Sequence, residues 1–248
     1  VTALDIDIGA LRTWVNAAWA TRKVKVMYVE FYNVPVGRYP AVRLLNAAQL
    51  PGTEPTPTPM SAYGLTVATH APIYVKGNFN YLATGLTNWK PAALVADAII
   101  FQSPNWNDNT NGGAYGVNPE SYLAAGGFSA ASTMYVYAAV AAGHSPTICD
   151  WQTAGCSGVY ATNYGGGLEN FPRFLENWGG FTLLYRGSLV SLYDAQQAAI
   201  RTWGATPTYY SPPTRDWRFD LRFNTPDNLP PGTPLVGTVM QLAYRPVY

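Results

Sequence analysis

Residues Gly64–Asn80 read GLTVATHAPIYVKGNFN, and a related pattern returns at Ala93–Asp108 as ALVADAIIFQSPNWND. In both stretches a short run rich in Val, Ile and Leu ends at a polar corner, and no helix-length segment separates successive runs. Three later stretches have the same character: Met134–Ala142, Phe181–Tyr185 and Ser188–Tyr193. Because Gly, Pro and Asn end strands, this spacing predicts short strands that stack as successive rungs.

Repeated runs without strict alternation favour a mainly β fold, a parallel β-solenoid whose inward side chains stack from coil to coil. A β-sandwich is the alternative, but it needs hairpins, and no Asn-Gly or Asp-Gly turn joins two of these strands directly, since Asn111-Gly112 lies inside the long polar excursion Asn105–Tyr122. We expect one domain over residues 1–248, because all-β chains of this length often form a single unit. Long loops are expected at Gly52–Met60, Asn105–Tyr122 and Gly143–Asn170.

The first 21 residues are expected to form a helix that covers one open end of the solenoid. Thr2 is a suitable N-cap, and Asp5 and Asp7 would lie in the first turn, where the helix dipole favours negative charge. The apolar residues recur at helical spacing: Leu4, Ile8, Leu11 and Val15. Later segments are expected to be strands, at Val24–Tyr32, at Val42–Leu45 and at Trp217–Phe223, where apolar and charged residues alternate.

The composition points to a protein that works outside the cell. Charged residues make up only 12% of the chain, while it contains 23 Gly, 20 Pro, 18 Tyr and 8 Trp. The formal net charge of +1 predicts no general affinity for nucleic acid, so a local patch would have to supply it. No run reaches the length of about 18 apolar residues that a membrane span requires, and we expect any targeting segment to precede this chain.

The only two cysteines, Cys149 and Cys156, are separated by DWQTAG. A disulfide between them would close a small loop in an oxidising compartment, and two unrelated thiols are the alternative. Without a second pair of ligands nearby, a structural zinc site is not expected.

Several phrases in this order resemble a known family: Ala41–Pro51, Gly64–Asn80, Pro91–Asp108, Leu168–Gly180, Arg186–Leu192 and Tyr210–Asp220. Together they resemble the large C-terminal region of bacterial type IV pilus-associated proteins, the PilX-like minor pilins. The resemblance implies a secreted, surface-displayed module with a role in adhesion, pilus assembly or DNA capture, whose partners are other pilus or surface proteins. The chain departs from a pilin because it has neither the prepilin peptidase site nor the long apolar N-terminal helix.

Cations interleaved with aromatic residues form the candidate ligand site. The candidates are Lys76, Trp89, Lys90, Arg215, Trp217, Arg218 and Arg222, with Tyr209 beside them. Aromatic rings stack on bases while cations meet phosphate, but Asp216 and Asp220 would neutralise much of this patch. Carbohydrate binding competes equally, because Trp106, Trp151 and Trp178 could lie against sugar rings. The structural alternative is that most of these aromatic residues pack the rungs.

Carboxylates offer two further hypotheses. Asp97 and Asp108 could act as acid and base in a polysaccharide lyase or hydrolase, although a role for Asp97 in satisfying corner backbone groups is favoured. Glu169 and Glu176 would share a face if their segment were helical, with Arg173 paired to one of them. Catalysis there is the less favoured interpretation.

Oxygen-bearing side chains cluster at Asn105, Asn107, Asp108 and Asn109, and oxygen is the ligand that calcium uses. The cluster has no closing glutamate at the spacing of an EF-hand, so a polar turn is the alternative. No other cofactor is expected. The sequence thus predicts a non-enzymatic extracellular module, with a polysaccharide-active enzyme and a self-assembling filament subunit as alternatives.

Overall fold

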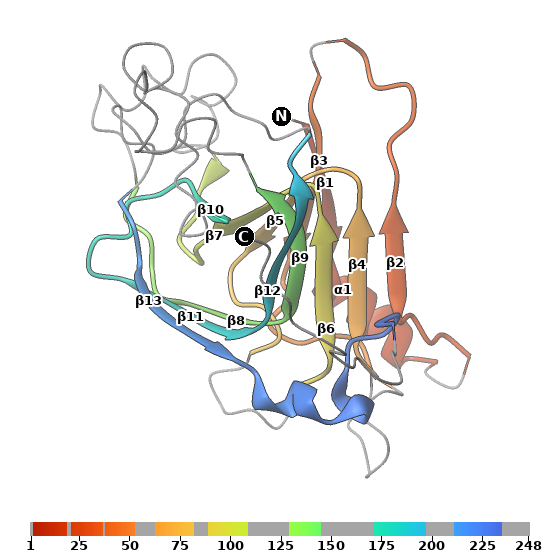
Figure 1. Cartoon of the computed structure of the whole chain (residues 1–248). Helices are drawn as coiled ribbons and strands as arrows, with labels where there is room; N and C mark the ends of the chain where they lie inside the picture. Colours follow the sequence, from red (N-terminus) through yellow and green to blue (C-terminus); the bar gives the residue numbers. More distant parts are fainter. Residues whose placement is uncertain are drawn as a thin grey trace, which may run out of the picture.

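The computed structural model describes residues 2–18, 21–36, 38–52, 63–81, 89–108, 129–144, 171–196 and 211–234. The predicted disulfide pair Cys149 and Cys156 lies outside these residues, as do Asn109, Trp151, Glu169 and Tyr209. Within them the protein is mainly β, with three parallel sheets and one short α-helix (Figure 1).

The strands divide into two five-stranded sheets and one three-stranded sheet. Sheet A has the order β1 (Thr2–Asp7), β3 (Pro40–Leu45), β5 (Ile73–Lys76), β7 (Ile99–Gln102), β10 (Pro172–Phe174). Sheet B has the order β12 (Leu189–Asp194), β9 (Ala139–His144), β6 (Ala92–Ala96), β4 (Leu65–Thr69), β2 (Val26–Val29). Sheet C has the order β13 (Thr214–Phe219), β11 (Thr182–Gly187), β8 (Met134–Tyr137).

Neighbouring strands in each sheet come from successive passes of the chain. From β7 the chain enters β8 in sheet C and then β9 in sheet B, and it repeats this order through β10, β11 and β12. The two corners from sheet C to sheet B are short: one residue, Ala138, separates β8 from β9, and Ser188 separates β11 from β12. Every ladder between the described strands is parallel, which a hairpin-built sandwich would not produce.

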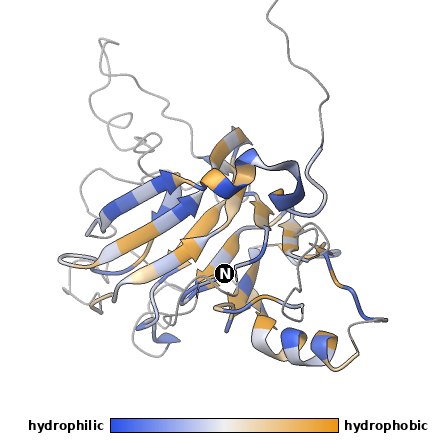
Figure 2. Ribbon diagram, turned by 90° about the horizontal axis from the view of Figure 1, so that it is seen from below, coloured by the Kyte–Doolittle hydropathy of each residue, from blue (hydrophilic) through white to orange (hydrophobic). Residues whose placement is uncertain are grey.

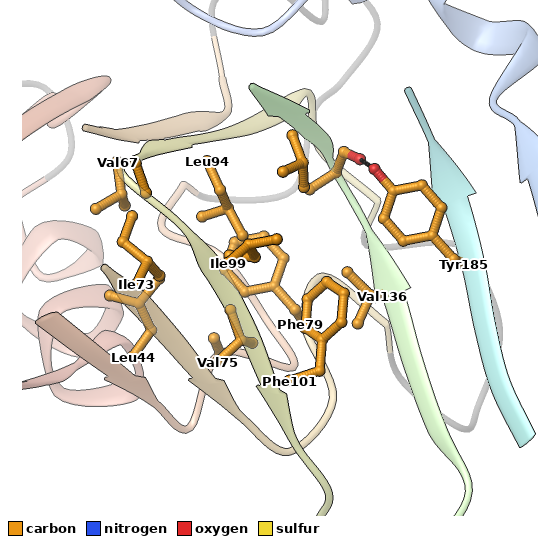
Figure 3. Close-up of a cluster of buried hydrophobic side chains, with 14 of the residues drawn as sticks. Leu44, Val67, Ile73, Val75, Phe79, Leu94, Ile99, Phe101, Val136 and Tyr185 are labelled. Carbon is orange, nitrogen blue, oxygen red and sulfur yellow. Dashed lines mark hydrogen bonds between the residues drawn. The ribbon is translucent and has the colours of Figure 1, made fainter. Parts of the chain in front are cut away.

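The core consists of side chains that stack in register from strand to strand. In sheet A, Leu44 lies beside Val75, which lies beside Phe101 in the next strand. These residues are fully buried and meet the inward side chains of the other two sheets (Figure 3). Tyr185 closes the cluster from β11, and its hydroxyl donates to the carbonyl oxygen of Ala138 at 2.6 Å. The core is therefore continuous across the three sheets.

The prediction of a helix over residues 1–21 was wrong for its first part. Thr2–Asp7 is strand β1, which pairs with β3 along its whole length, and the helix α1 spans only Ile8–Asn16. Asp7, not Thr2, is the N-cap, and its carboxylate accepts the N–H of Ala10 at 2.8 Å. Pairing with β3 outweighed the local helical pattern, because it gives β1 a ladder of backbone hydrogen bonds on one side and packs Ile6 against the core.

The predicted apolar stripe of the helix is confirmed from residue 8 onward. Ile8 and Val15 are fully buried, and Leu11 packs against the core at the end formed by β1 and β2. Hydrophilic and hydrophobic residues alternate around α1 in Figure 2, as expected for a helix with one buried side.

Three other local expectations need correction. The C-terminal strand β13 ends at Phe219, and the chain continues as two 3₁₀ turns, η6 (Leu221–Asn224) and η7 (Pro226–Asn228). Asp220 ends the strand because its carboxylate accepts the N–H of Arg222 and caps η6. The run Met134–Ala142 is two strands rather than one. The segment around Arg173 is strand β10 and not a helix.

Within the described part of the chain, no helix combines the length and the apolar character that a membrane span needs.

Candidate functional site

Several tyrosine and arginine side chains lie on the outer face of sheet C. Strand register places Tyr137 beside Arg186, and Arg186 beside Arg218, so these three residues form a row across β8, β11 and β13. A second row runs from Tyr135 through Leu184 to Asp216. We call the following residues the sheet C face: Tyr81, Tyr135, Tyr137, Arg186, Asp216, Arg218 and Arg222.

Three tyrosine rings lie nearly parallel on this face. The ring of Tyr81 stacks on Tyr135 with centroids 4.2 Å apart and on Tyr137 at 5.4 Å, each at an interplanar angle of 9°. Tyr81 and Tyr135 are partly exposed, whereas Tyr137 is buried. The rings therefore form a compact stack at one side of sheet C, in which Tyr81 lies against one face of Tyr135 and one face of Tyr137; we call this stack the platform.

Asn80 stabilises the turn of the chain that positions Tyr81 in this platform. It adopts a left-handed φ of 55°, and its side-chain amide donates to the carbonyl oxygens of Lys90 and Tyr137 at 2.6 and 3.0 Å. Its side-chain oxygen accepts the N–H of Lys90 at 3.1 Å. Asparagine suits this position because its short amide tolerates the left-handed conformation and bonds nearby backbone groups.

Arg222 extends the platform with a fixed guanidinium group. Its central carbon lies 4.1 Å from the ring centroid of Trp89 and 5.4 Å from that of Tyr137. Two nitrogens of Arg222 donate to the carboxylate of Asp220, each at 2.7 Å. Because Asp220 is itself buried, this bidentate pair holds the guanidinium in one orientation over the rings.

Asp216 joins the other two arginines of the face. Its carboxylate accepts from Arg186 at 2.9 Å and from Arg218 at 3.2 Å. The hydrogen bond from Arg186 lowers the pKa of Asp216, and Arg218 adds to this shift. The sheet C face thus presents three guanidinium groups, each held by a carboxylate, as the alternation of Asp216 and Asp220 with the arginines predicted.

No protein-family model matches the chain, and no curated protein or solved structure is significantly similar to it. The resemblance to minor pilins therefore stays a prediction from sequence. What the site can do has to be argued from its own residues.

The structure separates the seven sequence-predicted ligand residues. Trp89 and Arg222 meet, but Arg222 covers Trp89, which is only 7% exposed. Lys90 is 2% exposed, so its ammonium group is not offered to solvent as the prediction required. Trp217 points inward against Tyr185, with Arg215 over its ring at 5.3 Å. Lys76 lies on β5 in sheet A, away from the strands of the sheet C face.

Sequence reasoning missed four members of this face: Tyr81, Tyr135, Tyr137 and Arg186. Tyr135 and Tyr137 alternate with Met134 and Val136, and that period of two is the signal that one side of β8 faces outward. No comparable local signal marks Tyr81, which lies at the end of its polar corner.

The carboxylates considered for catalysis have structural partners. Asp97 is buried at the corner between β6 and β7 and accepts the N–H of Gln196 at 2.6 Å, as the favoured corner interpretation predicted. Asp108 accepts from Arg43 at 2.6 Å and from the indole N–H of Trp106 at 2.7 Å. The hydrogen bond from Arg43 holds the pKa of Asp108 below its ordinary value.

Glu176 lies in the segment after β10 and is fully buried. Its carboxylate accepts the N–H and the hydroxyl of Ser103, both at 2.7 Å. Burial raises the pKa of Glu176 despite these two hydrogen bonds. Glu176 therefore connects the turn after β7 to the segment after β10. Glu176 is bonded to Ser103, and the described carboxylate whose charge acts on Arg173 is that of Asp97.

The calcium hypothesis concerned Asn105, Asn107, Asp108 and Asn109. Asn105 donates to the carbonyl oxygen of Ala131 at 3.4 Å, and Asp108 is bound to Arg43. Among the residues that the structure describes, no group of three acidic, histidine or cysteine side chains is placed to hold a metal ion. The polar-turn alternative accounts for the contacts of Asn105 and Asp108.

Proposed function

We propose that this protein is a non-enzymatic binding module of the cell surface, and that its sheet C face binds an extended glycan. The observation that carries this proposal is the near-parallel set of rings of Tyr81, Tyr135 and Tyr137 beside three anchored arginines. Such a platform is preformed, so binding would require little reordering of side chains.

Sugar rings suit this face for two reasons. Their apolar C–H faces pack on flat aromatic rings, which contribute binding energy through buried area. Arg186 and Arg222 hold fixed N–H donors, Arg218 adds a more exposed one, and Asp216 adds acceptor oxygens beside them. Hydroxyl groups need both donors and acceptors, and these arginine–aspartate pairs supply the two together.

DNA capture is the second candidate, because rings and arginines also suit a nucleic acid strand. The carboxylates of Asp216 and Asp220 weaken this candidate, since they offset much of the charge that phosphates would meet. Phosphate binding would release counterions and would therefore weaken steeply with added salt. Glycan binding through neutral hydroxyl groups would depend little on salt.

We infer that the three sheets are the faces of one parallel β-solenoid, because the chain alternates between sheets A and B from β1 to β7 and then passes twice through sheets A, C and B in the same order. In such a fold the outward residues of successive coils form straight rows, which suits a polymer ligand.

The proposed display at the cell surface, the role in adhesion and the role in a type IV pilus rest on the sequence resemblance. A polysaccharide-active enzyme using Asp97 and Asp108 would first have to free both carboxylates from their partners.

Two binding experiments test this proposal. Isothermal titration calorimetry measures the binding of a panel of soluble neutral and acidic polysaccharides. Fluorescence anisotropy measures the binding of a labelled oligonucleotide across a series of salt concentrations. We expect a polysaccharide from the panel to bind, with little dependence on salt. Tyr81→Ala and Tyr135→Ala should each weaken its binding about fivefold to tenfold, because each removes a stacking ring worth about 1 kcal/mol.

Tyr32→Ala is the matched control, because Tyr32 is a tyrosine 75% exposed in the segment after β2, away from the sheet C face. Glycan binding that is unchanged in Tyr81→Ala and Tyr135→Ala would overturn the proposed site. Binding only to the oligonucleotide, with a steep loss in salt, would replace the glycan by DNA. Release of reducing or unsaturated ends from any polysaccharide would establish the enzyme instead.

A further inference from the structure

The arginines of the sheet C face outnumber the carboxylates that bind them. Arg186 and Arg218 share the carboxylate of Asp216, whereas Arg222 is paired with Asp220. Asp216 is the only acidic residue in the sequences of β8, β11 and β13. Three positive charges therefore meet two negative charges, and the face keeps one positive charge in excess.

The excess charge is concentrated on Arg218. Arg186 is only 19% exposed, and its terminal nitrogens donate to two carbonyl oxygens as well as to Asp216. Arg222 is 29% exposed and donates to both oxygens of Asp220. Arg218 is 71% exposed, and its Nε donates to Asp216 at 3.2 Å. In the described part of the chain, no group accepts a hydrogen bond from its two terminal nitrogens.

The free end of Arg218 has the geometry of an anion-binding group. Because Nε is bonded to Asp216, the edge of the guanidinium formed by the two terminal nitrogens stays open. This edge carries two parallel N–H groups that match the two oxygens of a carboxylate, and it also fits a sulfate. Arginine keeps its charge at every ordinary pH, and its hydrogen bonds to an anion are stronger than those to a neutral hydroxyl group.

Strand register sets the position of Arg218 relative to the platform. Tyr137, Arg186 and Arg218 form one row across β8, β11 and β13. The backbone of Arg218 therefore lies two strands from that of Tyr137, about 10 Å at the usual strand spacing. A glycan that stacks on the platform and runs across β11 would bring a following sugar to Arg218.

We propose that the sheet C face selects acidic glycans, and that the terminal nitrogens of Arg218 bind an anionic substituent, a carboxylate or a sulfate, of the glycan. This inference rests on the proposed function and adds the class of glycan to it. The rings supply contacts that do not depend on charge, while Arg218 discriminates between acidic and neutral polymers. Because only one ion pair forms at each site, binding should weaken little with added salt, unlike binding that rests on many phosphates.

Matched pairs of polymers test this proposal by separating charge from the rest of the ligand. Polygalacturonate is compared with its highly methyl-esterified form, and dextran sulfate is compared with dextran. Isothermal titration calorimetry measures the binding of each polymer to the wild-type protein, Arg218→Gln, Arg218→Lys and Tyr135→Ala. Arg38→Gln is the matched control, because Arg38 is an exposed arginine in the segment between β2 and β3. Melting temperatures verify that the variants fold.

We expect the wild-type protein and Arg38→Gln to bind the acidic member of at least one pair about fivefold more tightly than the neutral member. Arg218→Gln should remove this preference, because an uncharged amide gains nothing from the anion. Arg218→Lys should keep part of it, since lysine retains the charge but lacks the two parallel N–H groups. Tyr135→Ala should weaken the binding of both members by a similar factor, because stacking does not depend on charge.

Three results would overturn this inference and leave the glycan site in place. They are equal binding of the acidic and neutral members in both pairs, a preference that Arg218→Gln leaves unchanged, and an equal loss of preference in Arg38→Gln. Failure of the proposed function would look different: either no polymer binds, or Tyr135→Ala binds every polymer as tightly as the wild-type protein does. Either of these results would also overturn the role of Arg218 at that site.

Discussion

The α-carbon of Gly187 passes so close to Ala138 that an ideal β-carbon on residue 187 would lie 1.8 Å from the Ala138 carbonyl oxygen. Gly187 ends β11, and Ala138 forms the corner between β8 and β9, so the two residues mark where successive passes of the chain turn from sheet C into sheet B. The same carbonyl oxygen accepts the hydroxyl of Tyr185. Close approach of two backbone corners is therefore part of how successive passes of the chain pack.

Gly187→Ala should strongly destabilise the fold. The new methyl group would meet backbone atoms on one side and the Tyr185 hydroxyl at 2.8 Å on the other, so the corner would have to open. We expect the free energy of unfolding to fall by about 3 kcal/mol or more, measured by urea denaturation. Gly77→Ala is the control: it meets no atom within 4 Å and has a left-handed φ of 78°, so it should cost only about 1 kcal/mol. Equal losses in the two variants would contradict the role of close approach.

Arg43→Met should remove the network that joins β1 to the turn after β7. Arg43 donates to both oxygens of Asp5 at 2.7 and 2.8 Å and also to Asp108, while its own side chain is only 15% exposed. Both partners are partly exposed, so we expect a loss of about 1 kcal/mol in the free energy of unfolding. Arg218→Met, which removes an arginine that is 71% exposed, should change stability by less than about 0.5 kcal/mol. If Arg43→Met lowers the free energy of unfolding by no more than Arg218→Met does, the network adds no stability.

Asp108 should make the protein less stable in acid. Because Arg43 lowers its pKa in the folded state, Asp108 stabilises the fold above its ordinary pKa of 3.8, and this contribution disappears as the pH falls through the lower folded pKa. Asp108→Asn should therefore flatten the acid limb of a plot of unfolding free energy against pH. In an Arg43→Met background the same substitution should change that limb much less, because only the smaller effects of Trp106 and Lys76 then lower the pKa of Asp108. If Asp108→Asn changes the acid limb equally with and without Arg43, then Arg43 is not the main cause of the lowered pKa of Asp108.

Glu176 should act in the opposite direction. Burial raises its folded pKa above the ordinary 4.5, so its contribution to stability is complete below about pH 4.5 and is lost as the pH rises through the folded pKa. Glu176→Gln, which cannot ionise, should remove this decline. Urea denaturation of both proteins at a series of pH values would measure it. Parallel curves for the two proteins above pH 4.5 would contradict the raised pKa.

Local sequence was sufficient for most strands and corners. Gly64–Asn80 contains β4 and β5, and Val42–Leu45 lies within β3, because buried runs of Val, Ile and Leu closed by turn residues have few alternatives to a strand. The role of Asp97 at a corner was also predictable, since a buried carboxylate between two alanines needs backbone donors. These features depend on residues that are close together along the chain.

The candidate site was only partly predictable. The sequence places Trp217, Arg218 and Arg222 close together, and the structure keeps them near one another on and after β13. It could not show that Lys76 belongs to another sheet or that Lys90 is buried. Tyr81 and Tyr135, 54 residues apart, meet because separate passes of the chain pair as parallel strands, and no local pattern encodes the register of that pairing.

The sequence by itself determined the β-rich character, the short corners and the apolar side of α1, because these follow from neighbours a few residues away. Only the tertiary structure decided that Thr2–Asp7 is a strand, since its hydrogen-bond partners come from β3, 38 residues further along the chain. It also decided which residues share the sheet C face. The physical reason is that parallel ladders connect distant segments, and their register is set by packing of the whole core.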